Sequence, residues 1–194
     1  RRFDDAMKQF YDTIQVAKKV KSAQTLAPAA RKDFVGAYSE SETAKAEQAL
    51  RRFTQIDATD NYKMLGWLGH YYLDQGKPVK AIYIFHQLMK DKPKDPLLCE
   101  WQYKVVQATI IGGSKQEQVD ELSALIKLYT HVSTTKQVTG SALDECYENA
   151  AGVTAVFATN WHAEGIKTLN PDTLGLAHQL YHVYLDNFER AENV

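Results

Sequence analysis

This chain of 194 residues has no long apolar run, few cysteines and almost no net charge. No apolar run approaches the roughly 18–20 residues that a membrane-spanning helix needs. The two cysteines, Cys99 and Cys146, are too few for a disulfide scaffold, and we expect each to pack in a helix as a small apolar residue. They neither require nor exclude an oxidising compartment. The net charge of −1 provides no overall attraction to nucleic acid.

The chain also has no initiator methionine and no signal peptide, because it opens with Arg1 and Arg2 inside a helical pattern. We therefore expect it to be a fragment of a longer protein, and the missing signal says nothing about the compartment of the parent. Its charge is unevenly spread. Residues 1–136 hold 21 Lys and Arg against 16 Asp and Glu, whereas residues 137–194 hold 2 against 8. Either these are solvated helix faces, or the acidic end docks a basic partner.

Residues 61–96 carry the clearest pattern in the sequence. Apolar residues recur three and four positions apart in two successive segments, first Met64, Leu65, Leu68 and Tyr72, then Ala81, Ile84, Phe85 and Leu88. Such spacing gives each segment one buried helical face. Gly76 and Pro78 lie between the segments and Pro93 ends the second, so the pattern predicts an antiparallel helix hairpin.

This hairpin resembles a tetratricopeptide repeat (TPR), a helix-turn-helix unit of 34 residues. The residues in the characteristic places of the repeat are Leu68, Gly69, Tyr72, Gly76, Ala81, Phe85 and Pro93. The first large position departs from the pattern, since it holds Leu65 and a tryptophan, Trp67, follows two residues later. At the matched places we expect Gly69 and Ala81 to let the two helices approach closely, while aromatic side chains fill the space between them.

One hairpin cannot bury its own apolar face, so we expect neighbouring repeats to stack on it. Phe34, Val35 and Tyr38 precede Leu68, Gly69 and Tyr72 by 34 residues, which is the repeat length. The predicted organisation is helix B of a truncated repeat over 1–27, a degenerate repeat over 28–60, the central repeat over 61–95, an extended pair over 96–136, and a long helix pair beginning a further repeat over 137–194. No long strand-type alternation occurs. The fold class is therefore predicted to be all-α, a right-handed α-solenoid of antiparallel helix pairs cut from a longer array.

Several local features accompany this prediction. In the degenerate repeat, Ser41-Glu42-Thr43 replaces the glycine turn, and Ser39 or Ser41 is a candidate N-cap for the second helix. Residues 132–140 form a polar loop and a weak boundary. We expect turns at Gly112-Gly113-Ser114 and at Asn170-Pro171-Asp172. In the helix predicted from Ser141 to Thr168, Gly152 costs about 1 kcal/mol relative to alanine, and we expect close approach of a neighbouring helix to compensate for it.

Catalytic and metal-binding patterns fail on inspection. His178 and His182 have the spacing of two zinc ligands, but the glutamate of the HExxH motif is missing and the third-ligand candidates His162, Asp186 and Glu189 are distant in sequence. His162-Ala163-Glu164 resembles half of a zinc deaminase motif without its Pro-Cys-x-x-Cys partner. Neither cysteine has a paired histidine nearby, and Gly112 to Lys115 lacks the spacing of a phosphate loop. We therefore predict no catalytic residue, no metal and no cofactor.

The TPR resemblance implies that helix A of each repeat lines a concave groove in which partner proteins bind. Transfer from the central repeat places five residues toward that groove, namely Lys63, Trp67, His70, Leu73 and Asp74, and the following repeat adds Trp101 and Lys104. A tryptophan beside charged residues suits an anchor with a polar rim, although Trp67 could instead pack against the adjacent repeat. The TPR type that clamps a terminal carboxylate needs an asparagine where this chain has His70, so that function is not expected.

Two further runs, PLLCEWQYKVVQATIIGGSKQEQVDELSALIKLY and NPDTLGLAHQLYHVYLDNF, look like large TPR proteins of the bacterial cell envelope, including gliding-motility components of delta-proteobacteria. This resemblance implies a scaffold in a multiprotein periplasmic or envelope assembly. The predicted function is thus a non-catalytic scaffold that binds a partner protein or peptide, with no nucleic acid and no membrane span in this segment. Two alternatives stay open. One is a hydrolytic or lytic enzyme on a helical solenoid, and the other is an oligomerisation module.

Overall fold

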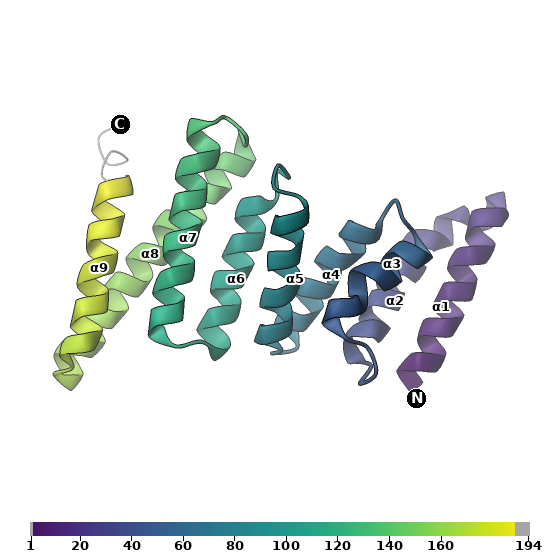
Figure 1. Cartoon of the computed structure of the whole chain (residues 1–194), viewed down its shortest axis with the longest axis horizontal. Helices are drawn as coiled ribbons and strands as arrows, with labels where there is room; N and C mark the ends of the chain where they lie inside the picture. The colour runs from purple at the N-terminus through teal and green to yellow at the C-terminus, as the bar shows by residue number, and fades with distance from the viewer. Residues whose placement is uncertain (1, 189–194) are drawn as a thin grey trace. The chain divides into compact units, whose positions relative to one another are not determined.

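The computed structural model of the chain describes residues 2–188, and over this range it contains helices and no strand (Figure 1). The α-helices are α1 (Arg2–Lys19), α2 (Ala27–Glu40), α3 (Ala49–Ile56), α4 (Asn61–Asp74), α5 (Pro78–Asp91), α6 (Leu98–Gly112), α7 (Lys115–Thr134), α8 (Ser141–Thr168) and α9 (Pro171–Phe188). Two short 3₁₀-helices, η1 (Lys21–Leu26) and η2 (Ala46–Gln48), precede α2 and α3. The predicted all-α class is confirmed.

The chain divides into two compact units, Arg1–Asp91 and Lys92–Val194. The division falls in the proline-containing connection between α5 and α6. It does not fall in the Val132–Gly140 segment, where a weak boundary was expected. Helix α7 continues to Thr134 there because Val132 is fully buried, and only a short turn separates α7 from α8.

In the first unit, α4 and α5 form the hairpin that the sequence predicts. A Cβ atom placed on Gly69 would lie 2.8 Å from Cζ and 2.9 Å from Cε1 of Phe85, so α5 approaches α4 closely enough that even a methyl group here would require the Phe85 ring to shift. Ala81, Tyr72 and Phe85 are buried. The close approach predicted at Gly69 is therefore confirmed. This contact determines which face of α4 packs against α5 and which face remains accessible.

Helices α2 and α3 meet through three aromatic rings. The centroid of Phe53 lies 6.3 Å from that of Phe34 and 5.2 Å from that of Tyr38, both in edge-on geometry. The prediction that Ser39 or Ser41 caps the next helix is wrong. The Ser39 hydroxyl donates to the Gly36 carbonyl inside α2 at 2.7 Å, and Ser41 follows the end of α2. Irregular chain and a 3₁₀ turn occupy residues 41–48, so α3 has only eight residues.

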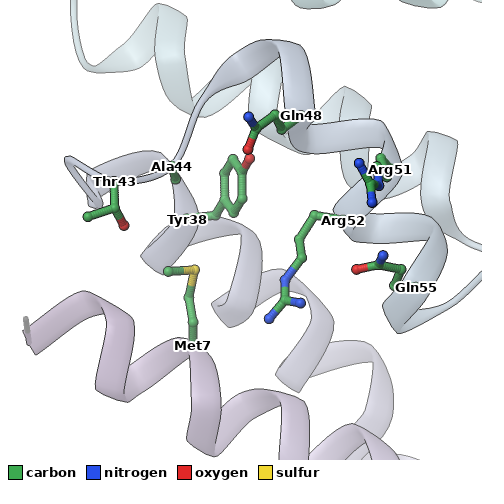
Figure 2. A pocket seen from close by; sticks show the side chains of 8 residues that line it. All are labelled: Met7, Tyr38, Thr43, Ala44, Gln48, Arg51, Arg52 and Gln55. Carbon is green, nitrogen blue, oxygen red and sulfur yellow. The ribbon is translucent and has the colours of Figure 1, made fainter.

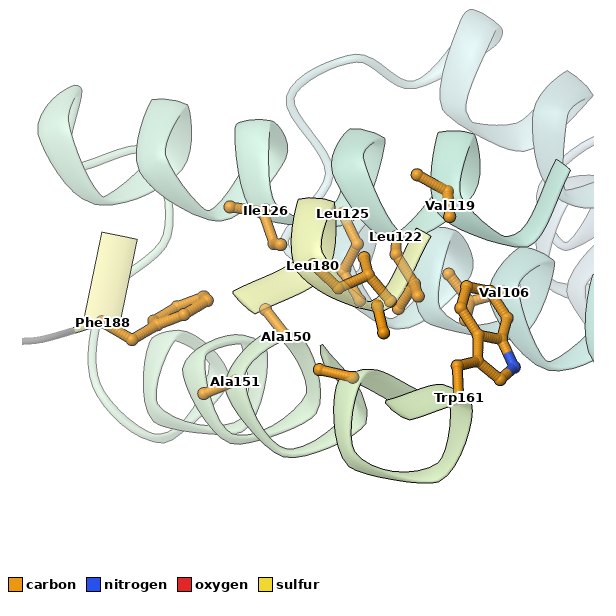
Figure 3. Close-up of a cluster of buried hydrophobic side chains, with 12 residues drawn as sticks. Val106, Val119, Leu122, Leu125, Ile126, Ala150, Ala151, Trp161, Leu180 and Phe188 are labelled. Atoms are coloured by element: carbon orange, nitrogen blue, oxygen red, sulfur yellow. The ribbon is translucent and has the colours of Figure 1, made fainter. Parts of the chain in front are cut away.

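The second unit packs α6, α7, α8 and α9 around one apolar cluster (Figure 3). Its buried members include Val106 of α6, Leu122 of α7, Trp161 of α8 and Leu180 of α9. The close approach predicted at Gly152 is wrong, since a Cβ there would have no neighbour within 4 Å. The tight contact is at Gly165, where a Cβ would lie 2.7 Å from Cγ of Leu174.

Both turns predicted in this unit are confirmed. Ser114 caps α7, because its hydroxyl accepts from the Glu117 amide at 3.2 Å while the Glu117 carboxylate accepts from the Ser114 amide at 2.7 Å. Asn170 caps α9, since its side-chain oxygen accepts from the amides of Asp172 and Thr173. These caps satisfy backbone N–H groups that have no partner within the helix.

Cys99 and Cys146 form a disulfide between α6 and α8, with their Cα atoms 5.4 Å apart. The expectation that each packs singly as a small apolar residue is therefore wrong, although both are buried beside Val132 and Val138. The pairing closes a chain segment with a sequence separation of 47. It also means that neither sulfur is a free thiol.

Candidate interaction site

The outward face of α4 carries the predicted partner-binding residues of the first unit. Because α4 buries Met64, Leu65, Leu68, Gly69 and Tyr72, the positions three and four apart on its other side remain accessible. This α4 stripe consists of Lys63, Gly66, Trp67, His70, Leu73 and Asp74, of which Lys63 and Asp74 are exposed and the rest are half-buried. Helical geometry thus brings the five predicted residues of this helix onto one face.

Trp67 lies at the centre of the α4 stripe. The Lys63 Nζ atom lies 5.4 Å from the centroid of its ring, a cation–π distance. A Cβ placed on the neighbouring Gly66 would have no contact within 4 Å, so the α4 surface is open at this position of the stripe. The Trp67 side chain is half-buried, neither fully enclosed nor fully exposed. Its arrangement suits an apolar surface with a polar edge.

His70 and Leu73 continue the α4 stripe toward the end of the helix. The His70 ring stands edge-on to the buried Phe85 ring, with centroids 5.5 Å apart, and this contact holds the imidazole in place. Leu73 is half-buried and Asp74 is exposed, so the stripe ends on a carboxylate. A positive charge at Lys63 and a negative charge at Asp74 therefore flank the aromatic centre.

The two residues predicted from the following helix pair belong to the second unit and differ from each other. Trp101 is only 6% exposed, so it is a packed side chain and offers no accessible face for an anchor. Lys104 is half-buried, and its Nζ donates to Gln107 Oε1 at 3.1 Å and lies 5.8 Å from the Tyr103 ring centroid. Of these two residues, Lys104 is the more accessible.

A hollow that the sequence did not indicate opens between α1 and α3 in the first unit (Figure 2). Its volume is about 450 Å³, and it is lined by Met7, Tyr38, Thr43, Ala44, Gln48, Arg51, Arg52 and Gln55. In Figure 2, Met7 from α1 and Arg52 from α3 project into this space, with Tyr38 of α2 between them. We call it the α1–α3 hollow. Three of its lining residues, Thr43, Ala44 and Gln48, belong to the segment between α2 and α3.

The α1–α3 hollow is positively charged. Arg51 and Arg52 are exposed, and no lining residue is acidic. The Tyr38 hydroxyl donates to the Lys45 carbonyl at 2.7 Å, and burial raises the pKa of Tyr38 to about 12, so it is a neutral phenol. Asp4 lies near the rim, where hydrogen bonds from the Ser41 and Thr43 hydroxyls lower the pKa of its carboxyl. The lining thus contains two guanidinium groups and two side-chain amides, with the Asp4 carboxylate at the rim.

Several residues that the sequence offered for catalysis have partners of their own in the structure. Cys99 and Cys146 are bonded to each other. Lys115, at the end of the glycine-rich turn, is held by Glu164 at 2.6 Å, and the Nδ1 of His162 lies 3.4 Å from the Tyr181 hydroxyl. Among residues 2–188, no three His, Cys, Asp or Glu side chains gather as a metal site would require. Within the same range no helix is both long and apolar enough to span a bilayer.

Comparison with protein-family models, curated proteins and solved structures gives no match for this chain. The functional argument therefore rests on the α4 stripe and the α1–α3 hollow. Of these two surfaces, sequence reasoning identified the first. The α1–α3 hollow could have been anticipated in the sequence from one feature only. This feature is the adjacent pair Arg51 and Arg52, which lies on the polar face of a short amphipathic helix.

Proposed function

We propose that the chain is a segment of a non-catalytic scaffold that binds a partner protein, and that the α4 stripe is its contact surface. The observation that carries this proposal is the half-buried Trp67, with the Lys63 ammonium 5.4 Å from its ring centroid and open space at Gly66. In the same proposal the helix pairs form a TPR-like, right-handed α-solenoid that belongs to a longer array. The close Gly69–Phe85 packing supports this repeat identity.

Trp67 has the properties of an interface anchor. Tryptophan is enriched among the few residues that dominate binding energy, because its large ring buries much apolar area at low conformational cost. His70 and Leu73 extend the apolar surface, and Lys63 and Asp74 supply a polar rim that selects orientation. A partner segment that presents an apolar side chain between charged groups fits this surface.

The α1–α3 hollow adds a preference for acidic partners. Neither Arg51 nor Arg52 has an ion-pair partner among residues 2–188, so an incoming carboxylate would not displace an internal one. Arginine binds carboxylates through two parallel hydrogen bonds, which makes such contacts specific as well as favourable. We propose that acidic side chains of the partner bind here.

We also propose that the parent protein works in a multiprotein assembly of an oxidising compartment, such as the periplasm. The Cys99–Cys146 disulfide supports this placement, because disulfides persist in oxidising compartments and are rare in the cytosol. Labelling of free thiols in intact cells, before and after reduction, tests it. A chain whose cysteines react without prior reduction would contradict this part of the proposal.

The binding proposal is tested with the segment as bait in extracts of its native cells, followed by affinity measurements on each retained protein. Trp67→Ala is expected to weaken binding of the true partner at least about tenfold, or about 1.4 kcal/mol. The double variant Trp67→Ala/His70→Ala should weaken it further. Both side chains lie on the outer face of α4, so circular dichroism should report an intact helical fold.

Val79→Ala is the matched control. Val79 is an apolar residue of the same unit, 80% exposed and outside the α4 stripe, so its loss should leave the affinity unchanged. Equal affinities of wild type, the Val79 variant and the double variant would refute the α4 stripe as the binding surface.

A further inference from the structure

Two histidines on α9 lie with their ring nitrogens facing each other. His178 and His182 are one helical turn apart and both side chains are exposed. Their Nε2 atoms are 3.1 Å apart and their ring centroids 4.4 Å apart. Sequence spacing places both rings on one face of α9, but it does not determine that the two Nε2 atoms converge.

We propose that His178 and His182 form a two-ligand chelate for a divalent transition-metal cation. Zinc–imidazole bonds are about 2.0–2.1 Å long, so two nitrogens on one ion at angles between about 90° and 110° lie about 2.8–3.4 Å apart. The observed separation of 3.1 Å falls in this range. Without a cation, the same approach allows one ring to donate its N–H to the other, which keeps the two imidazoles together.

The chemistry of the site selects the cation. Imidazole is a good ligand for Zn²⁺, Ni²⁺ and Cu²⁺, whereas Mg²⁺ and Ca²⁺ prefer oxygen ligands. Residues 2–188 contain no group of three side chains that could hold a metal, so within this range the site has two ligands, and the remaining positions are left to water or to a donor from another molecule. Glu189, a third-ligand candidate from the sequence, lies outside the described residues. The site is independent of the proposed binding surface on α4.

The position of the site on α9 gives the chelate a rigid base. Between the two histidines, Leu180 is fully buried in the core of the second unit, and Ala177, next to His178, is buried as well. These contacts hold the helix backbone in place, so the two histidines keep their one-turn spacing. Little backbone conformational entropy is therefore lost when a cation binds. A second ligand on the same rigid helix acts at high effective concentration.

Isothermal titration of the untagged chain with NiCl₂, repeated with ZnCl₂ and with MgCl₂, tests the proposal. The first two cations should bind with one high-affinity equivalent and the third should not bind. His178→Ala and His182→Ala should each weaken the Ni²⁺ affinity at least about tenfold, because a single imidazole has no chelate advantage. Both side chains are exposed, so circular dichroism should show the same helix content in each variant.

The matched control keeps the number of histidines and changes only their spacing. In the variant His182→Ala/Asp186→His the two histidines stand two turns apart on the same face, beyond the reach of one ion, and the high-affinity equivalent should be lost. His131→Ala, which removes an exposed histidine from α7, should retain it. The proposal is overturned if wild type shows no Ni²⁺ binding, if the respaced variant binds as tightly as wild type, or if the His131 variant loses binding.

Discussion

At the scale of single residues, Gly69 and Gly66 of α4 offer a direct test of the hairpin packing. Alanine at position 69 would put its Cβ 2.8 Å from Cζ of Phe85 and 3.2 Å from Cγ2 of Ile84, and both neighbours are fully buried. Overpacking of this kind costs about 1–3 kcal/mol. Gly69→Ala is therefore expected to lower the free energy of unfolding, as measured by urea denaturation.

Gly66→Ala is the control for that change. It is the same substitution in the same helix, but its Cβ would have no neighbour within 4 Å. Alanine is favoured over glycine in a helix interior by about 0.5–1 kcal/mol, so this variant should be more stable than wild type. Equal effects of the two substitutions would show that α5 does not pack against Gly69 as described.

Two buried tyrosines of the first unit, Tyr38 and Tyr72, differ in whether the hydroxyl group has a hydrogen-bond partner. The Tyr38 hydroxyl donates to the Lys45 carbonyl, whereas the Tyr72 hydroxyl is buried and has no hydrogen-bond partner within the described part of the chain. A typical hydrogen bond contributes about 0.5–1.5 kcal/mol, and an unsatisfied buried hydroxyl is itself costly. We expect Tyr38→Phe to lower the free energy of unfolding by about 1 kcal/mol, and Tyr72→Phe to leave it unchanged or raise it.

The aromatic ring contacts are the same before and after each change, so the comparison isolates the hydroxyls. In particular, the ammonium groups of Lys77 and Lys80 lie 5.9 and 5.3 Å from the Tyr72 ring centroid, and phenylalanine retains both contacts. If Tyr72→Phe proves the more destabilising substitution in urea denaturation, the Tyr72 hydroxyl must have a partner such as a buried water.

At the scale of elements, apolar periodicity was enough to predict where the helices lie. The pattern from Ser141 to Thr168 predicts α8 with the bounds that the structure shows, and the hairpin pattern predicts α4 and α5. These predictions succeed because each helix buries one stripe, and the stripe repeats every three to four residues. The same logic predicts the α4 stripe, which is the complement of the buried positions.

Contacts between elements were less predictable, and the glycines of α8 show why. Gly165 follows the buried Trp161 by four residues, so extension of the buried stripe indicates it as the close-approach position. Gly152 is exposed and lies off that stripe. The phase of the helix, rather than the presence of a glycine inside it, determines where a neighbouring helix can come near.

Features that depend on two distant segments were missed. The Cys99–Cys146 bond requires α8 to lie against the start of α6, and the buried position of Trp101 likewise depends on packing beyond its own helix. The α1–α3 hollow depends on the length of α3 and on the path of residues 41–48. The spacing of apolar residues along the sequence does not determine contacts between segments that are far apart in the chain. It also does not determine the directions in which the His178 and His182 side chains point.

At the scale of the whole molecule, the disulfide distinguishes the two compact units. Both cysteines, and the whole segment between them, belong to the unit Lys92–Val194, while the unit Arg1–Asp91 contains no cysteine. Closing a loop of this size restricts the unfolded chain and stabilises the folded one, typically by about 2–4 kcal/mol. Reduction should therefore weaken the second unit selectively.

Amide hydrogen exchange followed by mass spectrometry can test this segment by segment. With a thiol reductant, peptides from α6, α7 and α8 should exchange faster, because the free energy of opening falls, while peptides from α2, α4 and α5 should be unaffected. The variant Cys99→Ala/Cys146→Ala should exchange like the reduced protein and should not respond to reductant. Equal acceleration in both units would mean that they unfold as one cooperative body, whereas no acceleration in either would mean that helix packing alone accounts for the stability of the second unit.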